Sequence, residues 1–564
     1  MQIPIIIDVI EGIVYRIVVK IKPGKVHVVS LTNDVTASVR RARRNTLSDL
    51  LHRSRMRAPD RLALVYKDER LSYVEFDDRV NQTAWALSEG GVGYGTVTAV
   101  LSRNSMDFAV VNFALARLGA VMVPMNYMLT VTDLAYILQH SNVQVFLASI
   151  EFAEFLDQAS KRSNISISNR YLMDTQFAPS KLAHWHPLGA CRERMPTDLF
   201  ESNVSDEDVA HILYTSGTES KPKGVMLTHA NLVSEYVSTL IDGGMEARDV
   251  AIHALPLYHS AQLHGFLGPG IYIGSTGVIL PGAAPDVILE TIEQEKVTQL
   301  FCPPTVWIAL LRHPDFAKRD LSSLEKCYYG AAIMPREVLK ELSIRLPQAK
   351  FWNFYGQTEV APLATVLKPE DQMRKIGSAG KPALNVETGI VDEDGREVPR
   401  GTMGEIVHRT SHAMLGYLHN LEKTAEAFQG GWFHSGDLGV MDEEGYITVV
   451  DRKKDMIKTG GVNVSSREVE EFLYTIDGVS EVAVIGVPDS YWIEAVTAVI
   501  VPKIGASLDM ETIFVACKDH LSKFKVPKHI VLAEALPKNP SGKILKRELR
   551  ETYQGLSKSE HAGS

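Results

Sequence analysis

A strand–helix–strand pattern in the first third of the chain limits the fold more than any other feature. Thr96–Leu101 and Ala120–Val123 are apolar runs, and the helical segment Met106–Leu118 lies between them and stops at Gly119. Two parallel strands joined by a helix require a sheet with both faces covered. Because similar alternation continues to about Val450, the sequence predicts an α/β fold for most of the chain.

A second region follows and differs in character. Ser465–Ile476 has an apolar stripe at helical spacing, and shorter apolar runs follow it. The other elements expected here are strands at Val482–Val487, Val496–Val501 and Ile530–Leu532 and a helix near Met510–Lys523. About 100 residues of this mixed pattern predict a small α+β domain.

The chain is too long for one core, so we divide it into four parts. Of its 564 residues, 46–450 form the large α/β part and 451–550 the small α+β part. Residues 1–45 are an N-terminal extension without an assigned role, with a β-prone start and the basic cluster Arg40–Arg44. Residues 551–564 are a polar tail.

Charge and cysteine usage exclude several functions. A net charge of -9 disfavours sequence-independent nucleic-acid binding, which depends on neutralising phosphates, and we expect no nucleic-acid partner. The four cysteines are far apart and form no CxxC pair, which argues against a disulfide framework or a zinc site. This usage fits a reducing compartment and predicts a cytoplasmic protein.

No segment reaches the roughly 20 apolar residues of a membrane-spanning helix. The nearest, Leu255–Pro281, lacks charge but contains His259, Gln262 and several glycines, so we interpret it as a wall around an apolar ligand. A peripheral membrane contact and a homodimer are both compatible with the sequence.

The strongest local motif is Tyr214–Gly224, which follows an apolar strand. Gly217 permits a left-handed backbone whose N–H groups converge on an anion, and hydroxyls and two lysines surround it. These features are typical of a polyphosphate-binding loop, although the Walker A spacing is absent.

Three further motifs suit a nucleotide and a metal. Asn353–Glu359 combines an aromatic ring with a carboxylate suited to Mg²⁺, and Asp437 follows a Gly-rich turn where it could hold a ribose. The fourth motif, Pro540–Lys543, places a lysine near the C-terminus. Taken singly, each of these is weak.

In this order and at these separations the four motifs resemble the adenylate-forming superfamily, which includes acyl-CoA synthetases, over about residues 46–550. The resemblance implies a large adenylation domain of several subdomains and a small, mobile C-terminal domain. It also implies residues that bind ATP or AMP: Thr215, Ser216, Gly217, Thr218, Lys223, Gly330, Ala331, Ala332, Tyr355, Gly356, Asp437 and Arg452.

The resemblance assigns the chemistry as well. Lys543 would bridge the acyl carboxylate and the α-phosphate, and Thr358 would bind phosphate. Further implied roles are Mg²⁺ binding by Glu359 and Thr218, an acyl pocket at His259 and Gly330, a hinge at Lys454, and a CoA tunnel with Lys458, Gly460 and Gly461. A rotation about Lys454 would place Lys543 and Lys458 on opposite faces of the small domain, each for one step.

The implied activity is a ligation in two steps. A carboxylic acid is adenylated by ATP with release of pyrophosphate, and CoA then takes the acyl group and releases AMP, with Mg²⁺ as the cofactor. Leu255–Pro281 and Val297–Leu311 lack a carboxylate for an amino-acid ammonium, so we favour a fatty acid, with an aromatic acid second. Loading of a carrier protein remains an alternative. The Gly416–Asn420 segment departs from the family pattern, and we expect it to be peripheral.

Overall fold

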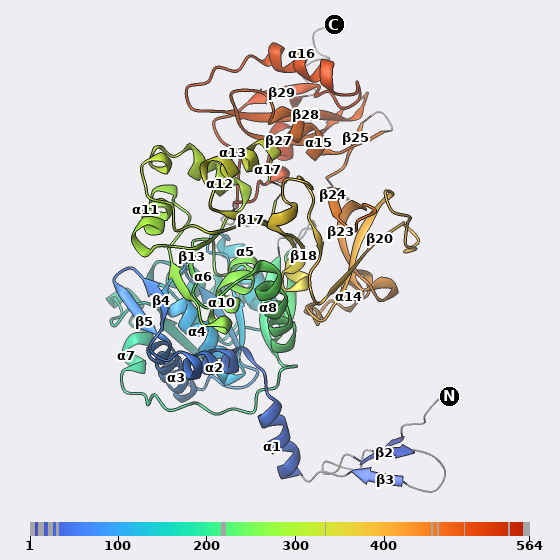
Figure 1. The fold of residues 1–564 in the computed structure, drawn as a ribbon. Coiled ribbons are helices and arrows are strands. Elements are labelled where there is room, and N and C mark those ends of the chain that lie inside the picture. The colour runs from blue at the N-terminus through green and yellow to red at the C-terminus, as the bar shows by residue number, and fades with distance from the viewer. Residues whose placement is uncertain are drawn as a thin grey trace.

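The computed structural model describes residues 6–8, 16–20, 26–29, 33–215, 221–332, 334–452, 455–459, 462–489, 491–539 and 542–556. It confirms the predicted class, since a large α/β part precedes a smaller α+β part (Figure 1). None of the described helices is long and apolar enough to cross a membrane.

An eight-stranded, mostly parallel sheet contains the predicted strand–helix–strand unit. Its order is β10-β9-β8-β6-β7-β11-β12-β22, and helix α4 (Met106–Leu118) joins β6 to β7 as expected. Ser105 caps the start of α4, and Gly119 ends it with a φ of 70°, which L-residues with a side chain rarely adopt. The strands are β6 (Val97–Leu101), β7 (Val121–Pro124), β8 (Val145–Ala148), β9 (Asn169–Leu172), β10 (His186–Pro187), β11 (Val209–Thr215), β12 (Lys223–Thr228) and β22 (Gly416–Tyr417).

A nine-stranded sheet lies beside it in the order β19-β18-β17-β16-β15-β13-β14-β4-β5. Its central strands are parallel, so their carboxyl ends share one edge. The strands are β4 (Leu62–Tyr66), β5 (Glu69–Ser72), β13 (Val250–His253), β14 (Thr276–Ile279), β15 (Gln299–Phe301), β16 (Lys326–Gly330), β17 (Lys350–Gly356), β18 (Leu363–Leu367) and β19 (Lys381–Pro382).

Helices pack between and around these two sheets. One buried apolar cluster joins α2, α3, α4 and α8 to strands of both sheets. The pattern Ser72-Tyr73-Val74-Glu75 predicts a capping box, and the structure has it at the start of α3. The helices of the large part are α2 (Leu47–Arg57), α3 (Tyr73–Glu89), α5 (Val131–His140), α6 (Ile150–Ser163), α7 (Leu188–Arg192), α8 (His229–Gly243), α9 (Ser260–Gln262), α10 (Gly268–Ile273), α11 (Pro285–Glu295), α12 (Pro304–Arg312), α13 (Arg336–Arg345) and α14 (Leu421–Ala427).

Two smaller sheets complete the fold. A four-stranded antiparallel sheet contains β20 (Val386–Val391), β21 (Met403–Thr410), β23 (Phe433–Met441) and β24 (Ile447–Arg452). The C-terminal sheet has β25 (Ile457–Thr459), β26 (Val462–Val464), β27 (Val479–Asp489), β28 (Ile493–Pro502) and β29 (His529–Leu532), with helices α15 (Ser466–Leu473), α16 (Met510–His520) and α17 (Lys546–Tyr553). Each element that the sequence predicts here is present with shifted ends.

The N-terminal extension forms β1 (Ile6–Asp8), β2 (Arg16–Lys20) and β3 (Val26–Val29), an antiparallel sheet in the β-prone segment. The sequence Lys22-Pro23-Gly24-Lys25 predicts a turn, but it lies outside the described residues. Helix α1 (Asn33–Arg43) carries most of the basic cluster, and Arg41 pairs with Glu201 of the large part.

A buried ion pair holds the helix layer together. Arg117 of α4 donates to Asp77 of α3 at 2.6 Å, and both side chains are almost fully buried. Burial alone would raise the pKa of Asp77, but His52 and Arg117 together lower it to about 2. The ionised pair is therefore favoured in the folded state.

We predict that Asp77→Ala lowers the free energy of unfolding of the large part by about 3–5 kcal/mol, because it leaves the Arg117 guanidinium buried without its counter-ion. Denaturant unfolding of this variant and of the exposed control Asp60→Ala measures the difference. The wild type should also lose this contribution as the pH falls from about 4 toward 2, since the folded pKa is the lower one. Equal midpoints for the two variants would contradict the prediction.

Candidate active site

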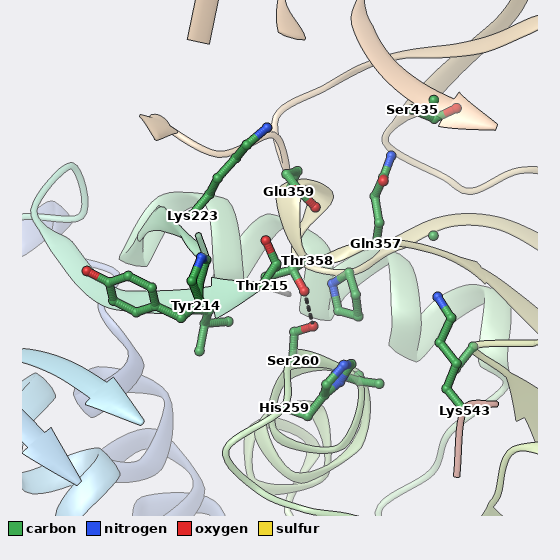
Figure 2. Close-up of a pocket in the computed structure, with 18 of the residues that line it drawn as sticks. Tyr214, Thr215, Lys223, His259, Ser260, Gln357, Thr358, Glu359, Ser435 and Lys543 are labelled. Atoms are coloured by element: carbon green, nitrogen blue, oxygen red, sulfur yellow. Dashed lines mark hydrogen bonds between the residues drawn. The ribbon is translucent and has the colours of Figure 1, made fainter. Parts of the chain in front are cut away.

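A cavity of about 720 Å³ opens where the two large sheets, the four-stranded sheet and the C-terminal part meet. Most of its residues lie at strand ends or in the turns that follow, which is where α/β sheets usually bind ligands. Figure 2 shows Lys543 on one side, Tyr214 and Lys223 on the other, and Thr358 and His259 between them.

The structure brings together many of the predicted site residues. Those that line the cavity are Thr215, Lys223, His259, Ala331, Tyr355, Gly356, Thr358, Glu359, Arg452 and Lys543. Ser216, Gly217, Thr218, Lys454, Gly460 and Gly461 lie outside the described residues.

Four predicted residues do not line the cavity. Gly330 is buried in β16, where an added Cβ would lie 2.3 Å from the Phe354 carbonyl oxygen, so glycine permits the close approach of β17. Ala332 is exposed one residue beyond the lining residue Ala331. Asp437 lies behind Tyr355, and Lys458 is exposed on β25, where its backbone N–H donates to Glu494 at 2.6 Å.

Tyr355 and Arg452 line one wall of the cavity, and Asp437 bonds to both from behind. The Tyr355 hydroxyl of β17 donates to Asp437 Oδ2 of β23 at 2.8 Å. Arg452 Nε of β24 lies 3.1 Å from Asp437 Oδ1, and the two residues face each other in the strand register. Burial raises the pKa of Tyr355, as does the charge of Asp437, so the ring stays a neutral phenol. This wall offers an aromatic face next to a carboxylate–guanidinium pair.

A buried carboxylate marks a second part of the cavity. Glu359 follows β17, and burial raises its pKa. The Tyr417 hydroxyl of β22 donates to Glu359 Oε1 at 3.0 Å, and Lys223 Nζ lies 5.1 Å from the Tyr417 ring centroid. The expectation that Gly416–Asn420 is peripheral is therefore wrong, because β22 pairs with β12 at the sheet edge and brings Tyr417 into the cavity.

Polar groups near Thr358 lie between the Tyr355–Arg452 wall and the part of the cavity around Glu359. The hydroxyls of Thr358 and Ser260 lie 3.0 Å apart. His259 Nδ1 accepts a hydrogen bond from the Ala261 backbone N–H, so a neutral ring keeps its proton on Nε2. Burial lowers the pKa of His259 to about 4, helped by the charge of Lys543.

The loop that carries Lys543 is docked against the large part. The Asn539 N–H donates to the Lys543 carbonyl oxygen, and the Lys543 N–H donates to the Asn539 side chain at 2.8 Å. The Thr305 hydroxyl at the start of α12 donates to the Gly542 carbonyl at 2.7 Å. In this arrangement Lys543 lines the cavity and Lys458 does not.

Several lining residues were not predicted as site residues, among them Glu235, Ser260, Gln357 and Tyr417. Ser260 and Gln357 are direct neighbours of motif residues, a signal that could have found them. Tyr417 and Glu235 reach the cavity only through tertiary packing.

Comparison with known proteins agrees with this geometry. The family model for AMP-binding enzymes matches residues 51–418, and the model for the C-terminal domain of AMP-binding enzymes matches residues 468–543. The chain belongs to the AMP-binding enzyme family. It is of the acyl-CoA synthetase type, an AMP-forming acid–thiol ligase.

The relatives of this chain are named for different acids, and each aligns with most of its length. A feruloyl-CoA synthase of Amycolatopsis sp is 35% identical over 89% of this chain and 98% of its own. A long-chain-fatty-acid–CoA ligase of Mycobacterium tuberculosis is 31% identical over 86% of this chain and 94% of its own. The solved structure of an anthranilate CoA ligase in complex with anthranoyl-AMP superposes with a TM-score of 0.85, at 27% identity, over 91% of this chain and 98% of that chain.

We predict that Tyr417→Phe lowers the rate of acid-dependent AMP formation about tenfold, the effect of losing one hydrogen bond to a charged group. Tyr94→Phe is the matched control, because the Tyr94 hydroxyl also donates to a carboxylate, Asp208, but does not line the cavity. An unchanged rate in Tyr417→Phe would show that this hydrogen bond does not support the chemistry.

Proposed function

We propose that the chain joins an aromatic carboxylic acid to CoA in two steps, with ATP and Mg²⁺. The observation that carries this proposal is the position of Lys543, which shares one cavity with His259, Glu359 and Lys223. The triphosphate would be bound by Thr215, Ser216, Gly217, Thr218 and Lys223. The adenosine would be bound by Gly330, Ala331, Ala332, Tyr355, Gly356, Asp437 and Arg452.

The first step must join two anions. The acid's carboxylate oxygen attacks the α-phosphorus of ATP, a new P–O bond forms, and the bond to the leaving pyrophosphate breaks. Lys543 would lie between carboxylate and α-phosphate and neutralise both, while Lys223 and Thr358 hold the phosphates. Catalysis then rests on orientation and on preorganised charge, not on a covalent enzyme intermediate.

Glu359 suits Mg²⁺. Its carboxylate is buried, lines the cavity and is oriented by Tyr417. Mg²⁺ is usually held by one or two carboxylates together with substrate phosphates, so a single carboxylate beside a phosphate site fits. When bound, the ion would neutralise phosphate charge, with Thr218 as a second ligand.

The second step needs a different arrangement of the C-terminal part. The CoA thiolate attacks the acyl carbon, a C–S bond forms, and the acyl–phosphate bond breaks to release AMP. Lys458, Gly460 and Gly461 would guide the thiol after a rotation about Lys454. Such a rotation would remove Lys543 from the cavity, so each lysine serves one step.

The acid-binding end of the cavity favours the aromatic acid over the fatty acid. Phe266 stacks on Phe301 with ring centroids 4.3 Å apart and lies 5.7 Å from Phe354, nearly parallel to both. All three rings line the cavity and present flat surfaces suited to a planar ligand.

An assay with ATP, Mg²⁺, CoA and a panel of benzoates, phenylacetates, cinnamates and fatty acids tests the function. We expect AMP and acyl-CoA from an aromatic acid, and neither product without ATP. Acyl-adenylate that passes to a carrier protein but not to CoA would support carrier loading instead. Fatty acids as the best substrates would overturn the aromatic assignment.

The half-reactions test the two lysines. We predict that Lys543→Ala lowers acid-dependent pyrophosphate exchange at least 100-fold yet still converts synthetic acyl-adenylate and CoA to product. Lys458→Ala should keep the exchange and slow the thiol step. The exposed Lys523→Ala is the control. If both variants lose both half-reactions equally, the division of labour is wrong.

A further inference from the structure

A buried carboxyl group lines the cavity and has no part in the chemistry described above. Glu235 lies in the middle of α8, on the helix face that packs into the core, and its exposed fraction is 0%. The sequence predicted no carboxylate in the acid pocket, because we considered only Leu255–Pro281 and Val297–Leu311. Helix α8 adds one from outside those segments.

The hydrogen bonding of Glu235 is incomplete. The Thr239 hydroxyl, one helical turn on, donates to Glu235 Oε1 at 2.6 Å. Oε2 is buried without a hydrogen-bond partner among the described residues. Burial raises the pKa of Glu235 well above its usual range, only partly offset by Thr239 and the Leu363 backbone. The raised pKa favours the neutral carboxylic acid, which can both donate and accept a hydrogen bond.

Structural roles do not account for this group. Glu235 lies too far inside α8 to cap it, and no cation of the described part of the chain forms an ion pair with it. A buried polar atom without a partner costs stability, and an apolar residue of similar size would avoid that cost. Such a group in a ligand cavity is expected where a ligand completes it.

Glu235 lies beside the ring-walled part of the cavity. The Leu363 backbone is close enough to Glu235 to lower its pKa, and Leu363 packs in one apolar cluster with Phe266, Phe301 and Phe354. Glu235, Leu363 and the three rings all line the cavity. A planar acid with its carboxylate at Lys543 would thus direct its remote edge toward the Glu235 carboxyl.

We propose that Glu235 selects aromatic acids that carry a hydroxyl or amino group on the ring, remote from the carboxylate, by pairing with that group. This inference rests on the proposed function and narrows its substrate class. A ring without the substituent, or an alkyl chain, would leave Glu235 Oε2 without a hydrogen-bond partner. Sites built to bind a substrate hydroxyl discriminate strongly against analogues that lack it.

Matched acids test the inference: 4-hydroxycinnamate against cinnamate, 4-hydroxyphenylacetate against phenylacetate, and 4-aminobenzoate against benzoate. We expect kcat/KM for AMP formation to be at least about tenfold higher for the substituted acid in the pair whose length fits. Glu235→Leu should abolish this preference and improve the unsubstituted acid, whereas Glu235→Gln, which keeps a donor and an acceptor, should retain much of it. The exposed Glu337→Leu is the matched control and should behave as wild type.

The outcomes separate this inference from the proposed function. If the wild type activates aromatic acids but has the same kcat/KM for the substituted and the unsubstituted acid in every pair, the role of Glu235 is refuted and the ligase assignment stands. If Glu235→Leu and Glu235→Gln both lower kcat/KM equally for all acids, the carboxyl is structural and the inference is overturned. If no acid supports AMP formation, both fail together.

Discussion

Two anions must meet in the cavity, and the rest of the site depends on that requirement. A carboxylate and a triphosphate repel each other, so positive charge has to be concentrated where they touch. The chain has a net charge of -9, so its overall field does not supply that charge. Lys223 and Lys543 line the cavity from different parts of the fold, and in the proposed function they supply it locally. The fold therefore brings together cations that are remote in sequence.

One of these cations belongs to the C-terminal part, which couples chemistry to domain position. Lys543 lines the cavity with its loop docked on the start of α12, through the Thr305–Gly542 hydrogen bond. By contrast, Glu359, Tyr417 and His259 belong to the large part, and their hydrogen bonds are made within it. The proposed function needs a phosphate and metal site that stays in place and a lysine that can leave, so that two successive reactions occur at one place.

Local signals in the sequence predicted the elements well, because capping and periodicity act over a few residues. The β6–α4–β7 unit, the Ser72 capping box and the C-terminal strands follow from such signals. The motifs expected to bind a nucleotide could be recognised as well, since they are contiguous stretches at strand ends. Most of their described members line one cavity, although Gly330 and Asp437 support that wall from behind.

Contacts between distant segments were not predictable in the same way. Tyr417 bonds Glu359 across 58 positions only because β22 joins the sheet edge next to β12. Glu235 lies on the apolar face of a helix, where the sequence pattern alone suggests a surface or a partnered carboxylate. Its importance emerges from complete burial beside the cavity, a property of the packed helix and not of its sequence.

A reversible crosslink between the two parts tests the central claim most directly. An added Cβ at Gly542 would lie 2.7 Å from Thr305 Oγ1 and 2.8 Å from Pro303 Cγ. Thr305→Cys with Gly542→Cys therefore allows a disulfide after a small shift of the Gly542 loop, and the reduced double variant is the reference for any effect of that shift. The oxidised double variant should still form acyl-adenylate but release no acyl-CoA, and reduction should restore the second step. If the oxidised enzyme completes both steps as fast as the reduced enzyme does, Lys543 does not need to leave the cavity, and the account is wrong.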